Sequence, residues 1–274
     1  TDAGSFLPNA GQQKFNLTTA LTSKLNKFIS TDISVAYTKS DVQSVFNVSG
    51  GPMLGLLAWP ANDDASAYLD DKGNRRRFST STTELENPFF NVNMNSINSA
   101  NDRYITNAKV MVDATKWLRF VGNVGYDYYT NKITQIRHPE SRLSGSTGGI
   151  FDQSVDNDRN INIQYYAQLT HSFLNDKLTT DFKVGSAIND QNNYVQSVQG
   201  TKFLAPGLYS IENTDPTTNR GRNRLTQRRL VGAFSSLNVG YNGMLYLSLT
   251  GRNDWSSTLP KDNNSFFYPS AGLS

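Results

Sequence analysis

Hydrophobic and polar residues alternate along much of the chain, which is the pattern of β-strands with one apolar face. The clearest example covers residues 230–241, where Val239 and Tyr241 share a face and small or polar residues occupy the other. A second alternating segment covers residues 245–250, and the Asn242-Gly243 dipeptide separates the two. Asn-Gly in this position is a strong hairpin signal, because both residues tolerate the positive φ angles of a tight turn. We therefore predict an antiparallel hairpin here.

The same period recurs and predicts nine strands, over residues 14–25, 28–38, 104–112, 117–129 (continuing to about 136), 161–173, 178–188, 230–241, 245–250 and from 266. Tight turns near residues 26, 115, 175 and 242 alternate with longer loops over residues 39–101, 138–159, 192–224 and 257–265. Strict alternation of tight turns with long loops is typical of outer-membrane barrels, and about ten residues cross a bilayer as a tilted strand. The pattern therefore predicts an all-β fold: a transmembrane antiparallel β-barrel with short periplasmic turns and long extracellular loops.

Aromatic residues gather near both ends of the predicted strands. Phe28, Trp117, Phe173 and Tyr241 lie beside the tight turns, whereas Tyr37, Tyr104, Tyr126, Tyr128 and Tyr165 lie toward the long loops. Barrels carry such aromatic girdles at the two membrane interfaces. General enrichment of aromatics in strands is the alternative, but it does not predict clustering at strand ends.

Composition narrows the class further. Hydrophobic residues make up 37% and aromatic residues 11% of the 274 residues, which suits strands that are apolar on one face only. The absence of cysteine excludes a disulfide framework and thiolate metal sites, and the net charge of +3 is too small to indicate nucleic acid as a partner. The first ten residues lack the basic region and apolar run of a signal peptide. Because the strand count is odd and the last predicted strand is cut short, we expect part of a larger barrel.

No catalytic residues, cofactor site or metal site are predicted, and the chain is not expected to be an enzyme. The two histidines, His138 and His171, have no nucleophile or ligand at a diagnostic spacing, and are expected to be solvated or interfacial. Asp156 and Asp158 lie in a predicted loop that lacks the glycine and terminal glutamate of a calcium-binding EF-hand. The Arg75–77 run is expected to be a solvated loop segment, with an anionic ligand or lipopolysaccharide as the alternative.

Two sets of residues are candidates for contacts. Aromatic residues in or beside the predicted outer segments could stack on sugars or anchor a partner: Trp59, Phe89, Phe90 and Trp255. Packing among the loops is the alternative, and for Trp255 it is favoured. Polar residues on the strand face opposite the apolar one are expected to face the lumen of the barrel, where they hydrate the interior or contact plug or substrate: Arg119, Asn123, Asp127, Asp181 and Lys183.

Two phrases in the C-terminal part of the chain are distinctive: LSLTGRNDWSSTLP (residues 247–260) and SFFYPSAGLS (residues 265–274). They closely resemble the SusC/RagA-type TonB-dependent transporters of Bacteroidetes outer membranes. The preceding RRLVGAFSSLNVGYNGMLYL and the loop phrase GGPMLGLLAWP (residues 50–60) are similar to the family too. Weaker similarity in strand style covers nearly the whole chain.

This resemblance implies a 22-stranded barrel that encloses an N-terminal plug, a SusD-like surface lipoprotein over its mouth, and energy from the TonB–ExbB–ExbD complex. It also implies contact with outer-membrane lipid and import of oligosaccharides or peptides. Residues 1–274 are expected to be part of one barrel domain, with the plug, the TonB-box region and the closing strands outside this sequence. A secreted or surface all-β carbohydrate-binding module or adhesin is one alternative, and an outer-membrane barrel enzyme is another.

Overall fold

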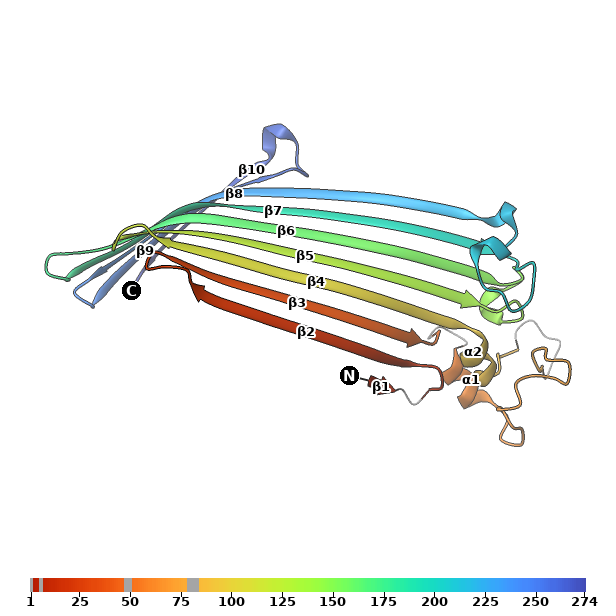
Figure 1. Ribbon diagram of the computed structural model, residues 1–274. Coiled ribbons are helices and arrows are strands. Elements are labelled where there is room, and N and C mark those ends of the chain that lie inside the picture. Colours follow the sequence, from red (N-terminus) through yellow and green to blue (C-terminus); the bar gives the residue numbers. More distant parts are fainter. Residues whose placement is uncertain (1, 5–6, 47–50, 78–83) are drawn as a thin grey trace.

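The computed structural model describes residues 2–4, 7–46, 51–77 and 84–274, and these form one antiparallel sheet. Ten strands follow one another in the sheet in chain order, each paired with the next (Figure 1). They are β1 Asp2–Gly4, β2 Gly11–Lys24, β3 Ile29–Ser44, β4 Ser96–Asp113, β5 Leu118–Arg137, β6 Ile150–Phe173, β7 Leu178–Thr201, β8 Arg220–Tyr241, β9 Leu245–Ser256 and β10 Ser265–Leu273. The predicted all-β meander is confirmed.

Tight turns join the strands at one end of the sheet, which we call the turn end. The predicted hairpin closes at Asn242 and Gly243, whose φ angles are 52° and 68°, and Met244 N–H donates to the Tyr241 carbonyl at 3.0 Å. Positive φ at both central residues is the geometry of a type I′ turn, whose twist matches that of paired strands.

Long connections between β3 and β4, β5 and β6, and β7 and β8 gather at the opposite, loop end (Figure 1). They carry the short helices α1 Pro52–Ala58 and α2 Pro88–Met94 and the 3₁₀ turns η1 Arg142–Ser144, η2 Ile211–Asn213 and η3 Pro216–Thr218. The β9–β10 connection, with η4 Lys261–Asn263, lies part-way along the sheet, because β9 ends where Ser256 pairs with Leu230.

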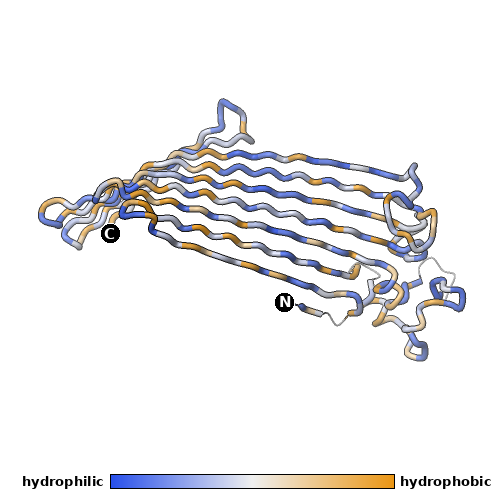
Figure 2. The backbone as a smooth tube through the Cα atoms, viewed as in Figure 1, coloured by the Kyte–Doolittle hydropathy of each residue, from blue (hydrophilic) through white to orange (hydrophobic). Residues whose placement is uncertain are grey.

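An apolar belt crosses one face of the sheet near the turn end. By strand register it covers residues 29–37, 104–112, 118–128, 161–173, 178–188, 231–241 and 245–255 of β3 to β9. Within it hydrophobic and hydrophilic residues alternate (Figure 2), and side chains such as Tyr165 and Val184 are about half exposed, at 54% and 45%. Each segment is close to the roughly 9–11 residues that a tilted strand needs to cross a bilayer.

The strands continue far past this belt. Both β6 and β7 have 24 residues, which at about 3.4 Å per residue gives roughly 80 Å, whereas a membrane belt is about 25 Å tall. Beyond the belt both faces are polar, as where Arg159 and Arg229 pair with Asp190 on the belt side of the sheet. The sheet therefore forms a tall wall, and only the part near the turn end has an apolar face suited to contact with lipid.

Two sequence predictions were wrong in extent. The structure has ten strands, because β1 is three residues long and too short to show a period. The long loops are also shorter than predicted: β3 runs to Ser44, β6 begins at Ile150, and β8 begins at Arg220. Alternation disappears where both faces meet water, although the backbone pairing continues.

Few side chains of the described residues form a hydrophobic core. The buried apolar residues are Phe46, Phe90, Val92, Val121 and Phe151, and most of them lie at the loop end. Among the described helices, none is long and apolar enough to cross a membrane. The apolar surface of the fold is thus concentrated on the belt, where it remains exposed.

Candidate functional site

A buried polar cluster ties the β3–β4 and β5–β6 connections together at the loop end. Glu86, whose side chain is 1% exposed, accepts hydrogen bonds from Arg142 N–H at 2.8 Å, Ser141 Oγ at 3.2 Å and Asn91 Nδ2 at 2.8 Å. Arg75 lies 3.8 Å from the same carboxylate. A buried carboxylate stays ionised only when it is paired and hydrogen-bonded in this way. The two connections are therefore held as one platform.

Arg75 differs from the solvated loop residue that the sequence indicates. It is 7% exposed, and it bonds Glu84 at 3.1 Å and the Glu140 carbonyl at 2.9 Å. Arg76 pairs with Asp63, and only Arg77 of the three is exposed. The run is a structural anchor, since its first two members are used inside the loops.

Aromatic rings extend this platform to the third connection, between β7 and β8. The centroid of the His138 ring lies 5.4 Å from that of Phe90 and 6.4 Å from that of Tyr209. The Tyr209 and Phe203 ring centroids are 5.2 Å apart. Burial lowers the pKa of His138 below its ordinary value and raises the pKa of Tyr209. Both rings are therefore uncharged near neutral pH, as their packing requires, and His138 is half-buried within the aromatic contacts.

The four predicted contact aromatics separate in the structure. Phe90 is fully buried, so the expectation that it offers a surface is wrong: its ring contacts those of Tyr68 and His138, and Asn87 caps α2 by accepting from Phe90 N–H at 3.1 Å. Phe89 and Trp59 are half-buried, and Trp59 Nε1 donates to Asp63 at 3.0 Å.

Trp255 also departs from its predicted place in an outer segment. It is in β9, paired with Val231, on the face that carries Leu249, and it is 40% exposed. It stands at the loop-end margin of the apolar belt, where amphipathic rings occupy the membrane interface. Trp255 therefore lies on a strand and not among the packed loops.

Exposed apolar side chains on α1 and in the β7–β8 connection were missed as candidates. Leu57 is 80% exposed, and the others are Met53, Leu54, Leu56, Leu204 and Leu208, at 41% to 61%. The sequence shows the apolar run at 53–59 as a signal, but not that the helix leaves it uncovered. Contiguous apolar side chains on a polar surface mark interaction sites, and four of these residues lie together on α1.

The five predicted lumen residues share the polar face of the sheet, opposite the belt. Arg119, Asn123 and Asp127 alternate along β5, and Asp181 and Lys183 occupy the same face of β7 through the register with β6. Among these, Asp127 accepts two hydrogen bonds from Arg103, from Nε at 3.0 Å and from Nη2 at 2.6 Å. Such pairing keeps the charges in fixed positions on the face.

Other charges on this face are paired too. Arg119 binds Asp113 at 2.5 Å, and Lys183 lies 3.4 Å from Asp181, which also accepts from Gln168. Asp156 and Asp158, expected in a loop, lie on strand β6 and accept from Asn193 at 2.7 and 3.4 Å. No group of three or more described His, Cys, Asp or Glu residues is placed to hold a metal ion.

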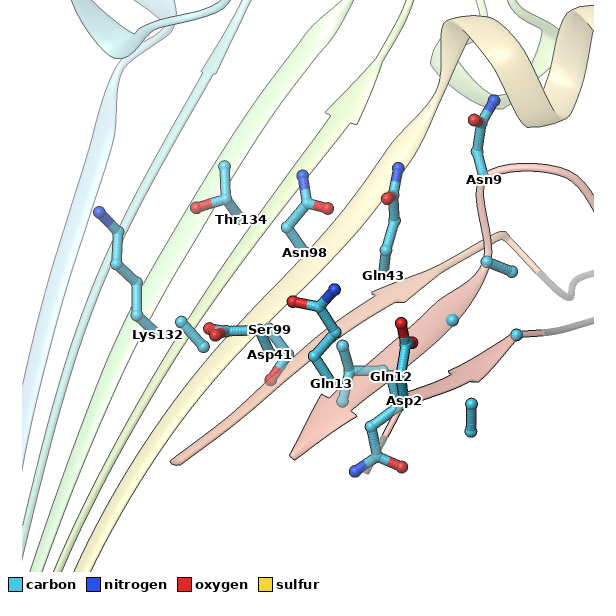
Figure 3. Close-up of a pocket in the computed structure, with 16 residues that line it drawn as sticks. Asp2, Asn9, Gln12, Gln13, Asp41, Gln43, Asn98, Ser99, Lys132 and Thr134 are labelled. Atoms are coloured by element: carbon cyan, nitrogen blue, oxygen red, sulfur yellow. The ribbon is translucent and has the colours of Figure 1, made fainter. Parts of the chain in front are cut away.

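A polar hollow of about 650 Å³ lies between the β1–β2 hairpin and the loop ends of β3, β4 and β5. Figure 3 shows the side chains of Gln13, Asp41, Asn98, Lys132 and Thr134 around it. These residues are in register with the belt side of the strands, beyond its margin. The hollow therefore opens on the outside of the wall and not on the polar face that carries the predicted lumen residues.

Comparison with known proteins gives the fold a context. No family model matches the sequence. The chain is 24% identical over 273 residues to TonB-dependent receptor P26 of Formosa agariphila, a match covering 95% of this chain and 26% of that protein. The structure resembles that of the RagAB peptide transporter with a TM-score of 0.79 at 16% identity, over 96% of this chain and 30% of the other. The chain has the fold of a segment of a SusC/RagA-type barrel.

A more distant likeness supports the same architecture. BauA, the ferric preacinetobactin receptor of Acinetobacter baumannii, matches 99% of this chain and 38% of its own with a TM-score of 0.53 at 11% identity. The chain spans about a quarter of the length of the curated relative it matches, at 26%. Its fold is that of the wall of an outer-membrane β-barrel, in which an apolar belt on the outer face meets lipid.

Proposed function

We propose that this chain forms part of the wall of an outer-membrane transporter that imports oligosaccharides or peptides by a TonB-dependent mechanism. The proposal rests on the division of the sheet into two parts. One part is an apolar belt that suits lipid, and the other is a tall polar wall whose loops contact one another at the loop end. A barrel with such a wall encloses a vestibule outside the membrane. Its chemistry is translocation, with no bond broken in the substrate. Residues 1–274 would all belong to one barrel domain of a longer protein.

The polar face would line this interior. Arg119, Asn123, Asp127, Asp181 and Lys183 lie together on that face, and four of them are charged residues engaged in ion pairs. Paired charges hydrate a surface without binding one ion strongly, because each charge is already compensated. These residues would thus present a wetted wall to the plug and to the passing substrate.

The loop end would receive a SusD-like surface lipoprotein. Its apolar docking element would be the exposed face of α1, with Leu56 at 51% and Leu57 at 80% exposure, beside half-buried Trp59 and Phe89. The platform is held together by Glu86, which accepts from Arg142 N–H, and by the ring contact of Phe90 with His138. TonB–ExbB–ExbD would act through a plug and TonB box in another part of the protein.

Two measurements test this function. Uptake of labelled oligosaccharides and peptides by cells that express the full-length protein should require TonB and should stop when the gene is deleted. The full-length protein should also need detergent for extraction from outer membranes. Release by salt or carbonate alone would refute the membrane barrel and favour a secreted adhesin.

A further inference from the structure

The upper half of β8 has an open edge. Because β9 ends at Ser256, opposite Leu230, residues 220–229 pair with β7 on one side and with no described strand on the other. All ten of these residues are exposed. This opening lies between strands that are all present in the chain, beyond the belt and toward the loop end.

The direction of the backbone groups at this edge can be read from its last bonded residue. Arg229 N–H donates to Ser257 Oγ at 2.8 Å, and Ser257 N–H donates to the Arg229 carbonyl at 2.9 Å, so Arg229 directs both its groups to the open side. In an antiparallel sheet every second residue does the same. The free donors and acceptors of the edge therefore belong to Gly221, Asn223, Leu225 and Gln227.

The intervening positions carry four arginines, Arg220, Arg222, Arg224 and Arg228, which we call the arginine ladder. By register the ladder lies on the polar face, where Arg220 and Arg222 line a cavity of about 200 Å³ with Asp152, Ser197 and Gln199. No described carboxylate lies within ion-pair distance of a ladder residue, and Asp152 accepts from Gln199 instead. On the opposite face, by contrast, Arg229 is paired with Asp190 at 3.0 Å.

The spacing of the ladder matches one kind of ligand. Alternate residues of a strand lie about 6.8 Å apart, which is also the repeat of side chains along any extended peptide. Ladder positions are the ones whose backbone groups point to β7, so an added antiparallel strand would face them in non-hydrogen-bonded pairs. In such pairs the Cα atoms are about 4.5 Å apart and opposite charges attract.

We propose that this edge binds an extended acidic peptide by strand addition, with carboxylates at alternate positions on the arginine ladder. The backbone of the peptide would bond the edge groups of Asn223 and Gln227, while its acidic side chains neutralise the inward-facing arginines. The inference rests on the proposed import function and narrows its substrate class. Charged residues also protect open edges from unwanted pairing, and a purely protective ladder would bind no such peptide.

Binding can be measured on the full-length protein in detergent, by fluorescence anisotropy of a labelled heptapeptide in which glutamate alternates with threonine. We expect saturable binding that weakens as salt rises, and about tenfold or greater loss in the Arg222→Gln/Arg224→Gln variant. The control variant Asn223→Glu/Gln227→Glu changes the net charge equally but on the other face, and it should lose markedly less. A peptide with glutamine in place of glutamate should not bind.

A second pair of peptides tests strand addition itself. Methylation of the threonine amides, which would face β8, should abolish binding, whereas methylation of the glutamate amides, which would face away, should preserve it. Equal effects of the two methylations, equal losses in the two protein variants, or binding of oligogalacturonate in preference to the acidic peptide would each overturn the proposal. Because binding is measured without uptake, failure of transport would refute the proposed function while leaving this result readable.

Discussion

Replacement of Glu86 should release the loop platform to a degree that depends on the new side chain. In Glu86→Ala three donors lose their acceptor: Arg142 N–H, Ser141 Oγ and Asn91 Nδ2. Each unsatisfied buried donor costs about 1–3 kcal/mol. The local free energy of opening should therefore fall by at least about 3 kcal/mol, which corresponds to roughly a hundredfold change in the opening equilibrium.

Glu86→Gln should be much milder for a specific reason. Its carbonyl can still accept from Arg142 N–H, and its amide can donate to Asn91 Oδ1, a buried atom without a hydrogen-bond partner in the described structure. This requires a flip of the Asn91 amide, and the Ser141 hydroxyl loses its acceptor. The ion pair with Arg75 is lost, but Arg75 keeps Glu84 at 3.1 Å. Because one donor loses its acceptor in place of three, we expect a change of about 1 kcal/mol.

Hydrogen exchange followed by mass spectrometry on the full-length protein resolves the two cases. Peptides covering residues 86–95 and 138–145 should exchange about a hundredfold faster in Glu86→Ala and less than tenfold faster in Glu86→Gln. Glu212→Ala serves as the control, because Glu212 is exposed. Equal exchange in the alanine and glutamine variants, or no change in either, would refute the account of Glu86 as the acceptor that joins the two connections.

Three further outcomes follow from the wall. Leu249→Arg places a charge in the belt and should cost about 2–4 kcal/mol in folding into lipid vesicles, whereas Ser248→Arg on the polar face should be nearly neutral. Gly185→Val should lower the yield of heat-modifiable folded barrel, with a cost of about 1–3 kcal/mol, because a Cβ there would overlap a neighbouring backbone carbonyl of β6. The pKa of Asp215 is lowered to about 2, chiefly by its hydrogen bond from Lys202. Since the folded pKa lies below the unfolded value near 3.9, the contribution of Asp215 is complete above about pH 4 and is lost as pH falls through 2. Hydrogen exchange of the η3 turn, corrected for its intrinsic pH dependence, should show this loss, and Lys202→Met should move it to higher pH.

The apolar belt and its turns could be predicted because they are local properties of the chain. Each belt strand meets lipid on one face and water on the other, which imposes a period of two on its sequence. Residues 230–250 show this most plainly, and Asn242-Gly243 fixes the turn through its positive φ angles. For the same reason the register follows: a slip by one residue would turn every apolar side chain to the wrong face.

The sequence by itself determined the class of fold, the nine strands from β2 onward and the face on which Arg119, Asp127 and Lys183 lie. Only the tertiary structure decided what happens beyond the belt. There both faces are polar, so strand and loop look alike in sequence, and Arg220 was assigned to a loop although it begins β8. Burial in the platform likewise depends on contacts between distant connections, which is why Phe90 and Arg75 were expected at the surface. The open edge of β8 follows from where β9 ends, a relation between two strands that no local pattern records.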